Sequence, residues 1–340
     1  MLQVVCLNSL HSKLKLAEEY PGLEEALPYY YGGKHEESHG SMLNWTYLNS
    51  IDMGRVQKRI RSTFLMVACK FQGQDCSRSW LLARSKQGSC LRFQPQRFDN
   101  LPYSRRLTLS MVLAFNKTDW TDCGWNHHLD GFTIYITGRH DRALMGPEYI
   151  MLTDVTRGIP VVDLKQQRKV LLGEPYSECI KSSQSLVHYE NYTQNQCTHE
   201  CLINAAKNYC NCTATYFPPA IKEEDGRLPV CTFKQHAQCI VPFQEKYDYS
   251  DCVCPPECDV RITKVEAIQY GHYAHDPNAL PDLKLTSVMF NLDNEAVNIH
   301  EHPEYTKAAL MSDIGGAAGL ILGMSASTIV GVLDYVLKGF

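Results

Sequence analysis

The chain has 340 residues, fifteen cysteines and a formal net charge of -4. A net charge of that sign gives no indication of a nucleic-acid partner. The length leaves room for one large domain or two ordinary ones beside a single membrane segment.

Four segments have the apolar or alternating pattern of β-strands. The first is the apolar run at residues 2–7, and the others are residues 106–115, 131–136 and 283–290, each bounded by turn residues. Because the last three lie far apart in the sequence, we expect them to pair in a mixed sheet. A short loop between Cys69 and Cys76 with a central glycine is typical of a stapled turn.

Most of the cysteines lie in one block, at Cys179, Cys197, Cys201, Cys210, Cys212, Cys231, Cys239, Cys252, Cys254 and Cys258. Within this block, residues 198–209 have helical spacing, with Thr198 as the expected N-cap. Four Asn-x-Thr sequons argue for the oxidising side of a membrane, at Asn44, Asn116, Asn191 and Asn211. Disulfides are therefore the favoured interpretation.

A zinc protein is the alternative interpretation of the cysteines. Its ligands would come from Cys210-x-Cys212 and Cys252-x-Cys254. Structural zinc sites usually separate their paired cysteines by about two residues or more, which disfavours this alternative.

The C-terminal segment has the character of a membrane helix. Residues 314–333 carry no charge, and a helix of that length spans roughly 30 Å, the hydrocarbon thickness of a bilayer. Asp313 and Asp334 bracket the segment. Small residues recur at every fourth position, in one row where another backbone can approach closely. They are Gly315, Gly319, Gly323, Ser327 and Gly331. A pore-lining helix of an oligomer explains both features, whereas a one-pass anchor needs neither.

The beginning of the chain raises a question of topology. A large ectodomain before a C-terminal span needs an N-terminal segment to start translocation. The residues that precede Cys6 are too few for a signal peptide or a membrane helix. We therefore expect the sequence to be incomplete at its N-terminus.

The order of the cysteines, together with several short motifs, resembles the degenerin and epithelial sodium channel family, which includes the acid-sensing ion channels. The motifs are Gly315-Gly316 after Asp313, Gly323-Met324-Ser325 in the apolar segment, Pro175-Tyr176 before Cys179, Gly131-Phe132 at the start of a strand, and the opening Cys6-Leu-Asn8 with Ser12-Lys-Leu14. The resemblance extends over essentially the whole chain.

The resemblance implies a set of disulfides. They are Cys6 with Cys90, Cys69 with Cys76, Cys179 with Cys258, Cys197 with Cys254, Cys201 with Cys252, Cys210 with Cys239, and Cys212 with Cys231. Cys123 is left without a counterpart in the pattern, and it could be free, buried or linked to a partner chain.

The architecture implied by the resemblance is an α+β fold. Residues 1–312 would form a disulfide-rich extracellular domain of palm, finger and thumb type, with a central mixed β-sheet and a helical thumb at 179–258. Residues 313–337 would form the second transmembrane helix, which contains the pore, and residues 338–340 the start of a cytosolic tail. The first transmembrane helix of the family would be missing. The complete protein would cross the plasma membrane more than once, with most of this chain outside the cell.

The resemblance implies that the protein is one subunit of a trimeric, voltage-independent, sodium-preferring cation channel. The channel would be gated through its ectodomain, and it would need no cofactor or bound metal. Three identical or related subunits would surround one pore in the lipid bilayer. Gly323, Met324 and Ser325 would form the selectivity filter, where small side chains and exposed carbonyls replace part of the water shell of a sodium ion. The pore mouth and gate would consist of Ser312, Asp313, Gly315 and Gly316. A bulky residue at the first of these positions would hold the pore open.

Two of these assignments have plainer alternatives. Asp313 could serve as the N-cap of the membrane helix, a role that is compatible with gathering cations at the pore mouth. Tyr176 is assigned as a gating contact between the base of the thumb and the first membrane helix. The alternative for Tyr176 is an ordinary aromatic residue of the core.

The sequence does not identify the stimulus that would open the channel. An extracellular peptide, protons and mechanical load are all compatible with it, and so is a channel that is constitutively open. Glu245 matches one carboxylate position of the acid-sensing members, but Val241 occupies the other, which disfavours direct proton gating. Histidines that titrate near neutrality are a second route to acid sensitivity, and exposed histidines without function are the plainer interpretation. They are His127, His128, His272, His275, His300 and His302.

A single-pass, cysteine-rich receptor or adhesion ectodomain is the alternative from a different functional class. It explains the cysteines, the sequons and one span, but it gives no reason for Asp313 or for Gly323-x-Ser325. An enzyme has less support, because no nucleophile with a base and no pair of carboxylates stands out.

Overall fold

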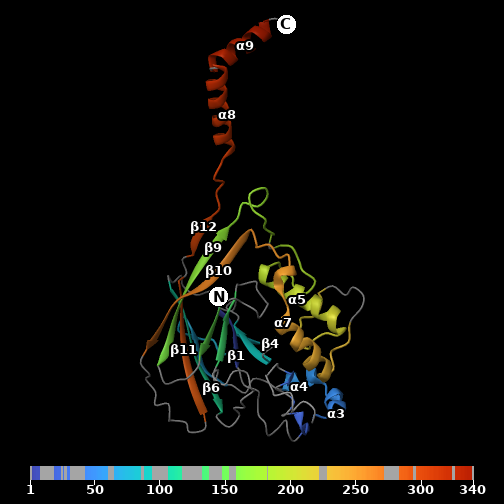
Figure 1. Cartoon of the computed structure of the whole chain (residues 1–340). Helices are drawn as coiled ribbons and strands as arrows, with labels where there is room; N and C mark the ends of the chain where they lie inside the picture. Colours follow the sequence, from blue (N-terminus) through green and yellow to red (C-terminus); the bar gives the residue numbers. More distant parts are fainter. Residues whose placement is uncertain are drawn as a thin grey trace.

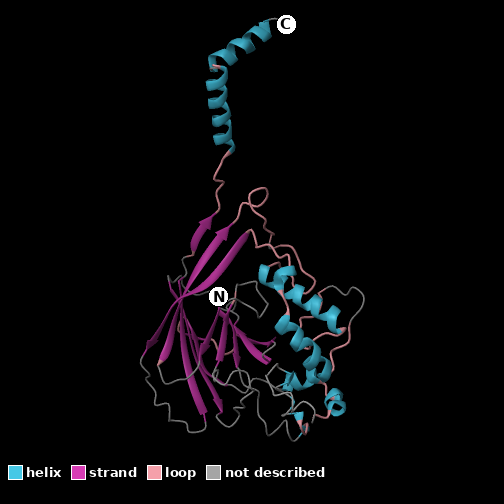
Figure 2. Cartoon of the chain, in the orientation of Figure 1, coloured by secondary structure: helices cyan, strands magenta, loops and turns pink. Residues whose placement is uncertain are grey.

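The computed structural model describes residues 2–7, 19–23, 26, 29–30, 43–59, 65–85, 88–93, 106–116, 132–137, 148–152, 158–181, 183–221, 228–271, 283–293, 296–323 and 326–338. The strands form two sheets, and most of the helices gather beside them (Figure 2). Two further helices project beyond the sheets at the C-terminus (Figure 1).

A seven-stranded mixed sheet is the centre of the fold. Its order is β10-β9-β11-β6-β2-β3, and β12 pairs with the C-terminal part of β9. β9 pairs in parallel with β11 and β12, and the other neighbours are antiparallel. The mixed sheet predicted for residues 106–115 and 283–290 is confirmed. The strands are β2 Leu65–Phe71, β3 Gln74–Asp75, β6 Arg106–Asn116, β9 Ile159–Val170, β10 Asp259–Gly271, β11 Leu283–Asp293 and β12 Val297–His300.

A second sheet has five strands, all antiparallel to their neighbours, in the order β4-β5-β1-β7-β8. The strand predicted at 131–136 lies here and not in the mixed sheet, because β7 pairs with β1 and with β8, the next strand along the chain. The register of β1 and β5 places Cys6 directly opposite Cys90, which is disulfide-bonded. The strands are β1 Leu2–Leu7, β4 Trp80–Ser85, β5 Gly88–Phe93, β7 Phe132–Ile136 and β8 Glu148–Leu152.

One hydrophobic core joins the two sheets. The five-stranded sheet contributes Phe93 and Ile134, and the mixed sheet contributes Phe71, Leu113 and Phe290, all of them buried. The rings of Phe71 and Phe93 meet edge to face, with 5.4 Å between their centroids. Burial of each large apolar side chain stabilises the fold by roughly 1.5–3 kcal/mol, so this core holds the sheets together.

The thumb, residues 179–258, contains α5 Gln194–Cys210, α6 Phe233–Gln235, the π-helix η5 His236–Ile240, α7 Val241–Lys246 and the 3-10 helix η6 Tyr249–Asp251. α5 begins after Thr193, whose side chain accepts a hydrogen bond from the backbone N–H of Gln196 at 3.0 Å. The predicted N-cap Thr198 lies inside the helix, where its hydroxyl donates to the carbonyl of Gln194 at 2.9 Å. The helix therefore starts earlier than predicted, because Thr193 satisfies a free N–H of the first turn.

Five disulfides hold the thumb, and a sixth, Cys69–Cys76, closes the turn between β2 and β3. All six were predicted and are confirmed. The zinc alternative is wrong, because its four cysteines are in disulfides. Cys123 lies outside the described residues. The thumb pairs are Cys179–Cys258, Cys197–Cys254, Cys201–Cys252, Cys210–Cys239 and Cys212–Cys231.

Two short helices, α3 Trp45–Ser50 and α4 Met53–Arg59, belong to a second hydrophobic cluster that includes the thumb residue Phe233. The ring of Phe233 is fully buried and lies 5.1 Å from that of Tyr30. The backbone N–H of Lys234 donates to Asn49 Oδ1 at 2.9 Å. These contacts fix the far end of the thumb to the N-terminal part of the chain.

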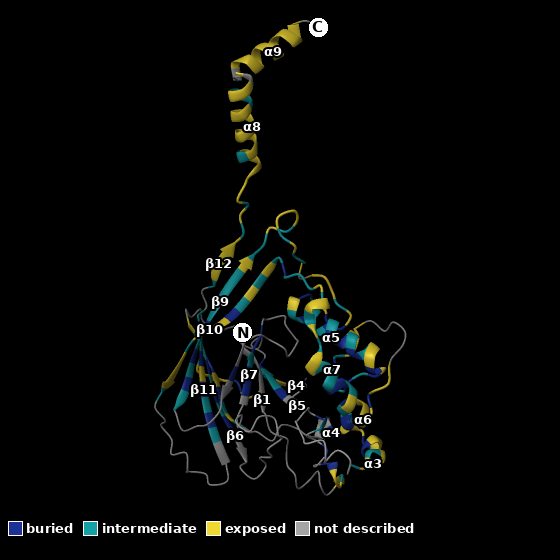
Figure 3. Cartoon of the chain, in the orientation of Figure 1, coloured by how far each residue is buried: buried dark blue, intermediate teal, exposed yellow. Residues whose placement is uncertain are grey.

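The C-terminal helices are α8 Lys307–Leu322, of 16 residues, and α9 Ala326–Lys338, of 13 residues. Both are almost entirely exposed in the single chain (Figure 3). In the part of the chain that the structure describes, no helix has both the length and the apolar character needed to cross a membrane. The one helix expected over residues 313–337 is instead two helices, because α8 ends at a left-handed glycine.

Candidate functional site

The start of α8 is fixed by a threonine and not by the predicted aspartate. Thr306 is the N-cap, and its side chain accepts a hydrogen bond from the backbone N–H of Ala309 at 3.1 Å. The N-cap alternative for Asp313 is therefore wrong, because Asp313 lies two turns further along the helix. The hydroxyl of Tyr305 donates to Asp313 Oδ2, and this hydrogen bond raises the pKa of Tyr305. The carboxylate remains exposed to solvent.

The pore-mouth residues predicted on α8 lie on an open surface. Ser312, Gly315 and Gly316 are exposed. A Cβ atom added at either glycine would meet no atom within 4 Å. Leu320 and Ile321 on the same helix are 89% and 78% exposed. Exposed apolar side chains on this scale need a partner surface or lipid to cover them.

Gly323 ends α8 with left-handed backbone dihedrals, φ 60° and ψ 22°. α9 begins at Ala326 and runs at a marked angle to α8 (Figure 1). The predicted row of small residues is therefore divided between two helices and does not form one continuous face. Met324 and Ser325, the rest of the predicted filter, lie outside the described residues.

A helix end at this point has a chemical consequence. The last four carbonyls of an α-helix have no partner within the helix. At the end of α8, Gly323 adds no side chain that would shield these carbonyls from another group. Carbonyl oxygens are suitable ligands for an alkali cation that has lost part of its water shell. Whether these carbonyls bind a cation at the helix break stays a prediction.

A carboxylate that sequence analysis missed connects the thumb base to the segment before α8. One oxygen of Glu301 accepts hydrogen bonds from the backbone N–H of Leu172 and from the hydroxyl of Ser177, each at 2.8 Å. These two bonds lower the pKa of Glu301. The backbone N–H of Glu301 donates to the carbonyl of Val170, the last residue of β9, at 2.9 Å. No local pattern could have revealed this contact, since Glu301 and Ser177 are 124 positions apart.

Tyr176 lies in the turn that Glu301 holds. Its backbone N–H donates to the carbonyl of Gly173 at 2.9 Å, and its side chain is 49% exposed. The alternative of an ordinary core residue is therefore wrong. The role of Tyr176 as a gating contact stays a prediction.

The candidate acid-sensing residues are not brought together. Glu245 is exposed on α7. The second carboxylate position of the acid-sensing members is occupied here by Val241, which is buried. His300 and His302 are exposed next to Glu301. The remaining candidates, His127, His128, His272 and His275, lie outside the described residues.

Two other histidines, which the sequence did not single out, are desolvated in the thumb. His199 Nδ1 is in hydrogen-bond contact with the hydroxyl of Tyr189, and burial lowers the pKa of His199 to about 4. His188 Nε2 lies 3.1 Å from Lys207 Nζ. Burial and then the charge of Lys207 lower the pKa of His188. Both rings are therefore neutral at physiological pH.

These histidines predict that acid destabilises the thumb. The folded-state pKa of His199 lies below its ordinary value of 6.5, so the unfolded chain binds the proton first as the pH falls. The contribution to stability is complete above pH 6.5 and is lost progressively as the pH falls to about 4. Between about pH 7 and pH 5 we expect a loss of about 2 kcal/mol in the free energy of unfolding from His199. Urea unfolding of the protein and of His199→Gln at both pH values measures it.

The exposed His302 provides the control for this experiment. Between about pH 7 and pH 5, the free energy of unfolding of His302→Gln should fall by as much as that of the unmodified protein. The fall in His199→Gln should be smaller by about 2 kcal/mol. An unchanged pH dependence in His199→Gln would contradict the assignment.

The sequons differ in accessibility. Asn44 is exposed, and its side chain accepts a hydrogen bond from the backbone N–H of Tyr47 at 3.1 Å as the N-cap of α3. Asn211 is exposed in the left-handed region that ends α5. Asn191 is half-buried before α5, and Asn116 is the last residue of β6. Glycosylation at the four positions stays a prediction.

Comparison with known proteins gives a consistent result along the chain. A family model described as "Amiloride-sensitive sodium channel" matches residues 7–335. Acid-sensing ion channel 2 of Homo sapiens is 25% identical over 300 residues, which cover 80% of this chain and 56% of that protein. Acid-sensing ion channel 1 of Gallus gallus is 23% identical over 300 residues, with 80% and 54% covered. The chain thus spans about half the length of the curated relatives it matches.

Proposed function

Because this chain belongs to the amiloride-sensitive sodium channel family, we propose that it is one subunit of a trimeric, voltage-independent, sodium-preferring cation channel that is gated through its ectodomain. The family consists of ion channels and not of enzymes, so the enzyme interpretation is excluded. Membership also removes the reason for the receptor or adhesion alternative, since family resemblance accounts for the same cysteines and for the C-terminal motifs as well.

The break between α8 and α9 is the observation that carries the proposal. Gly323 ends α8 in a left-handed conformation and has open space around it. In the proposed pore, three such helix ends meet and their carbonyls replace part of the water shell of sodium, with Met324 and Ser325 completing the filter. Interrupted helices are tolerated at membrane depth only where they line water or protein, and a pore provides both.

The exposed surface of α8 supports an oligomer. Gly315 and Gly316 allow close approach of a neighbouring helix, and the exposed apolar side chains need neighbouring subunits and lipid to cover them. Three copies of Asp313 at the outer mouth would attract cations, and Ser312 would lie where the helices are most crowded. Identical subunits and related subunits are both compatible with these features.

The disulfide-rich domain supports an extracellular location at the plasma membrane, because disulfides persist in oxidising environments. In this arrangement a ligand acts on the ectodomain, and a peptide and a proton are both candidates. Movement of the thumb reaches α8 through the turn at residues 173–177 and through Glu301, which precedes α8. The stimulus acts on the thumb, and the pore responds through this contact.

Subunit counting tests the assembly. When the protein is labelled with one fluorophore per chain and expressed at low density in the plasma membrane, single spots should bleach in at most three steps. Incomplete labelling gives a binomial distribution of one, two and three steps. A maximum of one step would show a solitary chain, and frequent four-step spots would show a larger assembly. Either result would overturn the trimer.

A further inference from the structure

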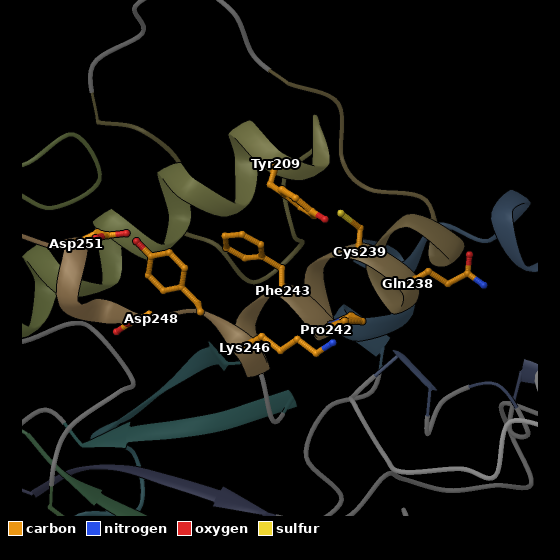
Figure 4. A pocket seen from close by; sticks show the side chains of 9 residues that line it. Tyr209, Gln238, Cys239, Pro242, Phe243, Lys246, Asp248 and Asp251 are labelled. Carbon is orange, nitrogen blue, oxygen red and sulfur yellow. The ribbon is translucent and has the colours of Figure 1, made fainter.

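A cavity of about 380 Å³ opens on the thumb surface. The thumb helices α5 and α7 lie away from the C-terminal helices α8 and α9 (Figure 1). The cavity lies between the C-terminal end of α5 and the elements α7 and η6 (Figure 4). Its walls combine aromatic rings, carboxylates and one lysine. The residues that matter for its chemistry are Tyr209, Phe243, Lys246, Tyr247, Asp248 and Asp251.

A row of aromatic rings forms the cavity wall. Tyr209 and Phe243 are stacked with 5.1 Å between ring centroids and 29° between ring planes. Phe243 and Tyr247 follow, with 5.3 Å and 32°. Tyr209 is 69% exposed, so the row is open to solvent at its α5 end. Faces of aromatic rings attract cations through the negative potential above the ring.

Two disulfides fix the ends of this row. Cys210–Cys239 joins the end of α5, next to Tyr209, to η5. Cys201–Cys252 holds the other end, where the hydroxyl of Tyr247 lies 3.3 Å from the Sγ atoms of both Cys201 and Cys252. The rings are therefore held in position before any ligand arrives, which reduces the entropy lost on binding.

The charge at the cavity is complementary to a cation. Asp248 accepts a hydrogen bond from the backbone N–H of Ser250 at 2.9 Å, and this bond lowers the pKa of Asp248. The side chain of Asp251 is exposed and makes no hydrogen bond or salt bridge with any residue in the described part of the chain. Desolvation and then the charges of Asp251 and Asp248 raise the pKa of Tyr247. Among the described residues, Lys246 is the one basic residue that lines the cavity, and its side chain extends toward Pro242, away from Asp251 (Figure 4).

We propose that this cavity is a binding site for an organic cation, an ammonium or guanidinium group carried on an apolar skeleton. The cation lies against the ring faces near Asp251, and the skeleton lies along the row toward Tyr209. Both kinds of group are required, because carboxylates alone would serve an inorganic cation equally well and aromatic rings alone would serve a neutral ligand. The site lies in the ectodomain and is independent of the proposed pore.

Calorimetric titration of the purified full chain with three matched probes tests the site. 2-Phenylethylammonium, 2-phenylethanol and phenylacetate share one skeleton and differ in charge. We expect the ammonium to bind about tenfold more tightly than the alcohol, and phenylacetate to give no heat of binding. Equal binding of ammonium and alcohol would overturn the proposal, and so would absence of ammonium binding at millimolar concentration.

Single substitutions measure separately what the carboxylates and the aromatic rings contribute to binding. Asp251→Asn and Phe243→Leu should each weaken ammonium binding about fivefold, while Lys246→Gln should strengthen it. Glu245→Gln removes an equal charge from α7 at a position that does not line the cavity, and it should leave binding unchanged. Displacement of the probe by calcium, with full binding in Phe243→Leu, would assign the cavity to an inorganic cation and overturn the proposal. Circular dichroism of each variant checks that the thumb is folded.

Discussion

Replacing Gly323 with alanine is expected to reduce the sodium current about tenfold at equal surface expression. A residue with a Cβ costs about 1–2 kcal/mol in the left-handed conformation that Gly323 adopts. A penalty of that size shifts the balance between a broken and a continuous helix roughly tenfold. A continuous helix would use the carbonyls of α8 in its own hydrogen bonds and withdraw them from the ion. Steric crowding is not the cause, since the added Cβ would have open space.

Gly331 provides a matched control. It lies within α9 and also has open space around it, but its backbone is helical. Gly331→Ala should therefore leave the current nearly unchanged. Whole-cell recording of both variants, with surface labelling to measure expression, makes the comparison. Equal currents in Gly323→Ala and in the unmodified protein would contradict a role for the helix break in permeation.

Removing the disulfide at the base of the thumb is expected to lower the free energy of unfolding by about 3 kcal/mol. Cys179 and Cys258 are 79 positions apart, but the inner disulfides already shorten the loop that this pair closes. For that reason the expected loss is smaller than the separation alone suggests. The backbone N–H of Cys258 also donates to the carbonyl of Ile180 at 3.0 Å, a bond that would remain. Urea unfolding of the Cys179→Ser/Cys258→Ser variant measures the loss.

The short disulfide of the β2–β3 turn is the comparison. Cys69 and Cys76 are only 7 positions apart, so their loop closure entropy is small, and the double serine variant should lose about 2 kcal/mol. A larger loss from this pair than from the thumb base would contradict the loop-closure explanation. Mass spectrometry of the unmodified protein before and after reduction confirms that both bonds are present.

Local sequence patterns were sufficient to predict elements in which apolar residues alternate or recur at a regular spacing. The strands at 106–115, 131–136 and 283–290 were predicted because apolar residues alternate there. Their division between two sheets was not predicted, since pairing depends on the registers of β1, β8 and β9, which lie elsewhere in the sequence. The disulfides were predicted only through resemblance to a family, because spacing alone allows many pairings.

The C-terminal segment was predicted less well for a different reason. An apolar run with a small residue at every fourth position fits a continuous helix, and the pattern does not distinguish a glycine that packs from one that ends the helix. The two glycines that behave differently, Gly323 and Gly331, have similar apolar neighbours. Which of the two glycines ends a helix depends on its position in the fold, which the local sequence does not show.

Contacts between residues that are distant in the chain could not be predicted from the sequence. Glu301 meets Ser177 across 124 positions, and Tyr247 meets Cys201 across 46. The desolvation of His199 likewise depends on how α5 packs against the rest of the thumb. Each of these features became visible only with the fold, and each contributes to the proposed coupling, the cavity or the acid response.

The most direct test of a cation pore is whole-cell recording of the protein with tryptophan in place of Ser312, while external sodium is exchanged for potassium. We expect a persistent inward current in sodium that does not depend on voltage-driven opening, with a reversal potential that becomes more negative in potassium. Ser312→Ala, a small substitution at the same exposed position of α8, should give no persistent current. Absence of any cation current with tryptophan at this position, at normal surface expression, would contradict the channel.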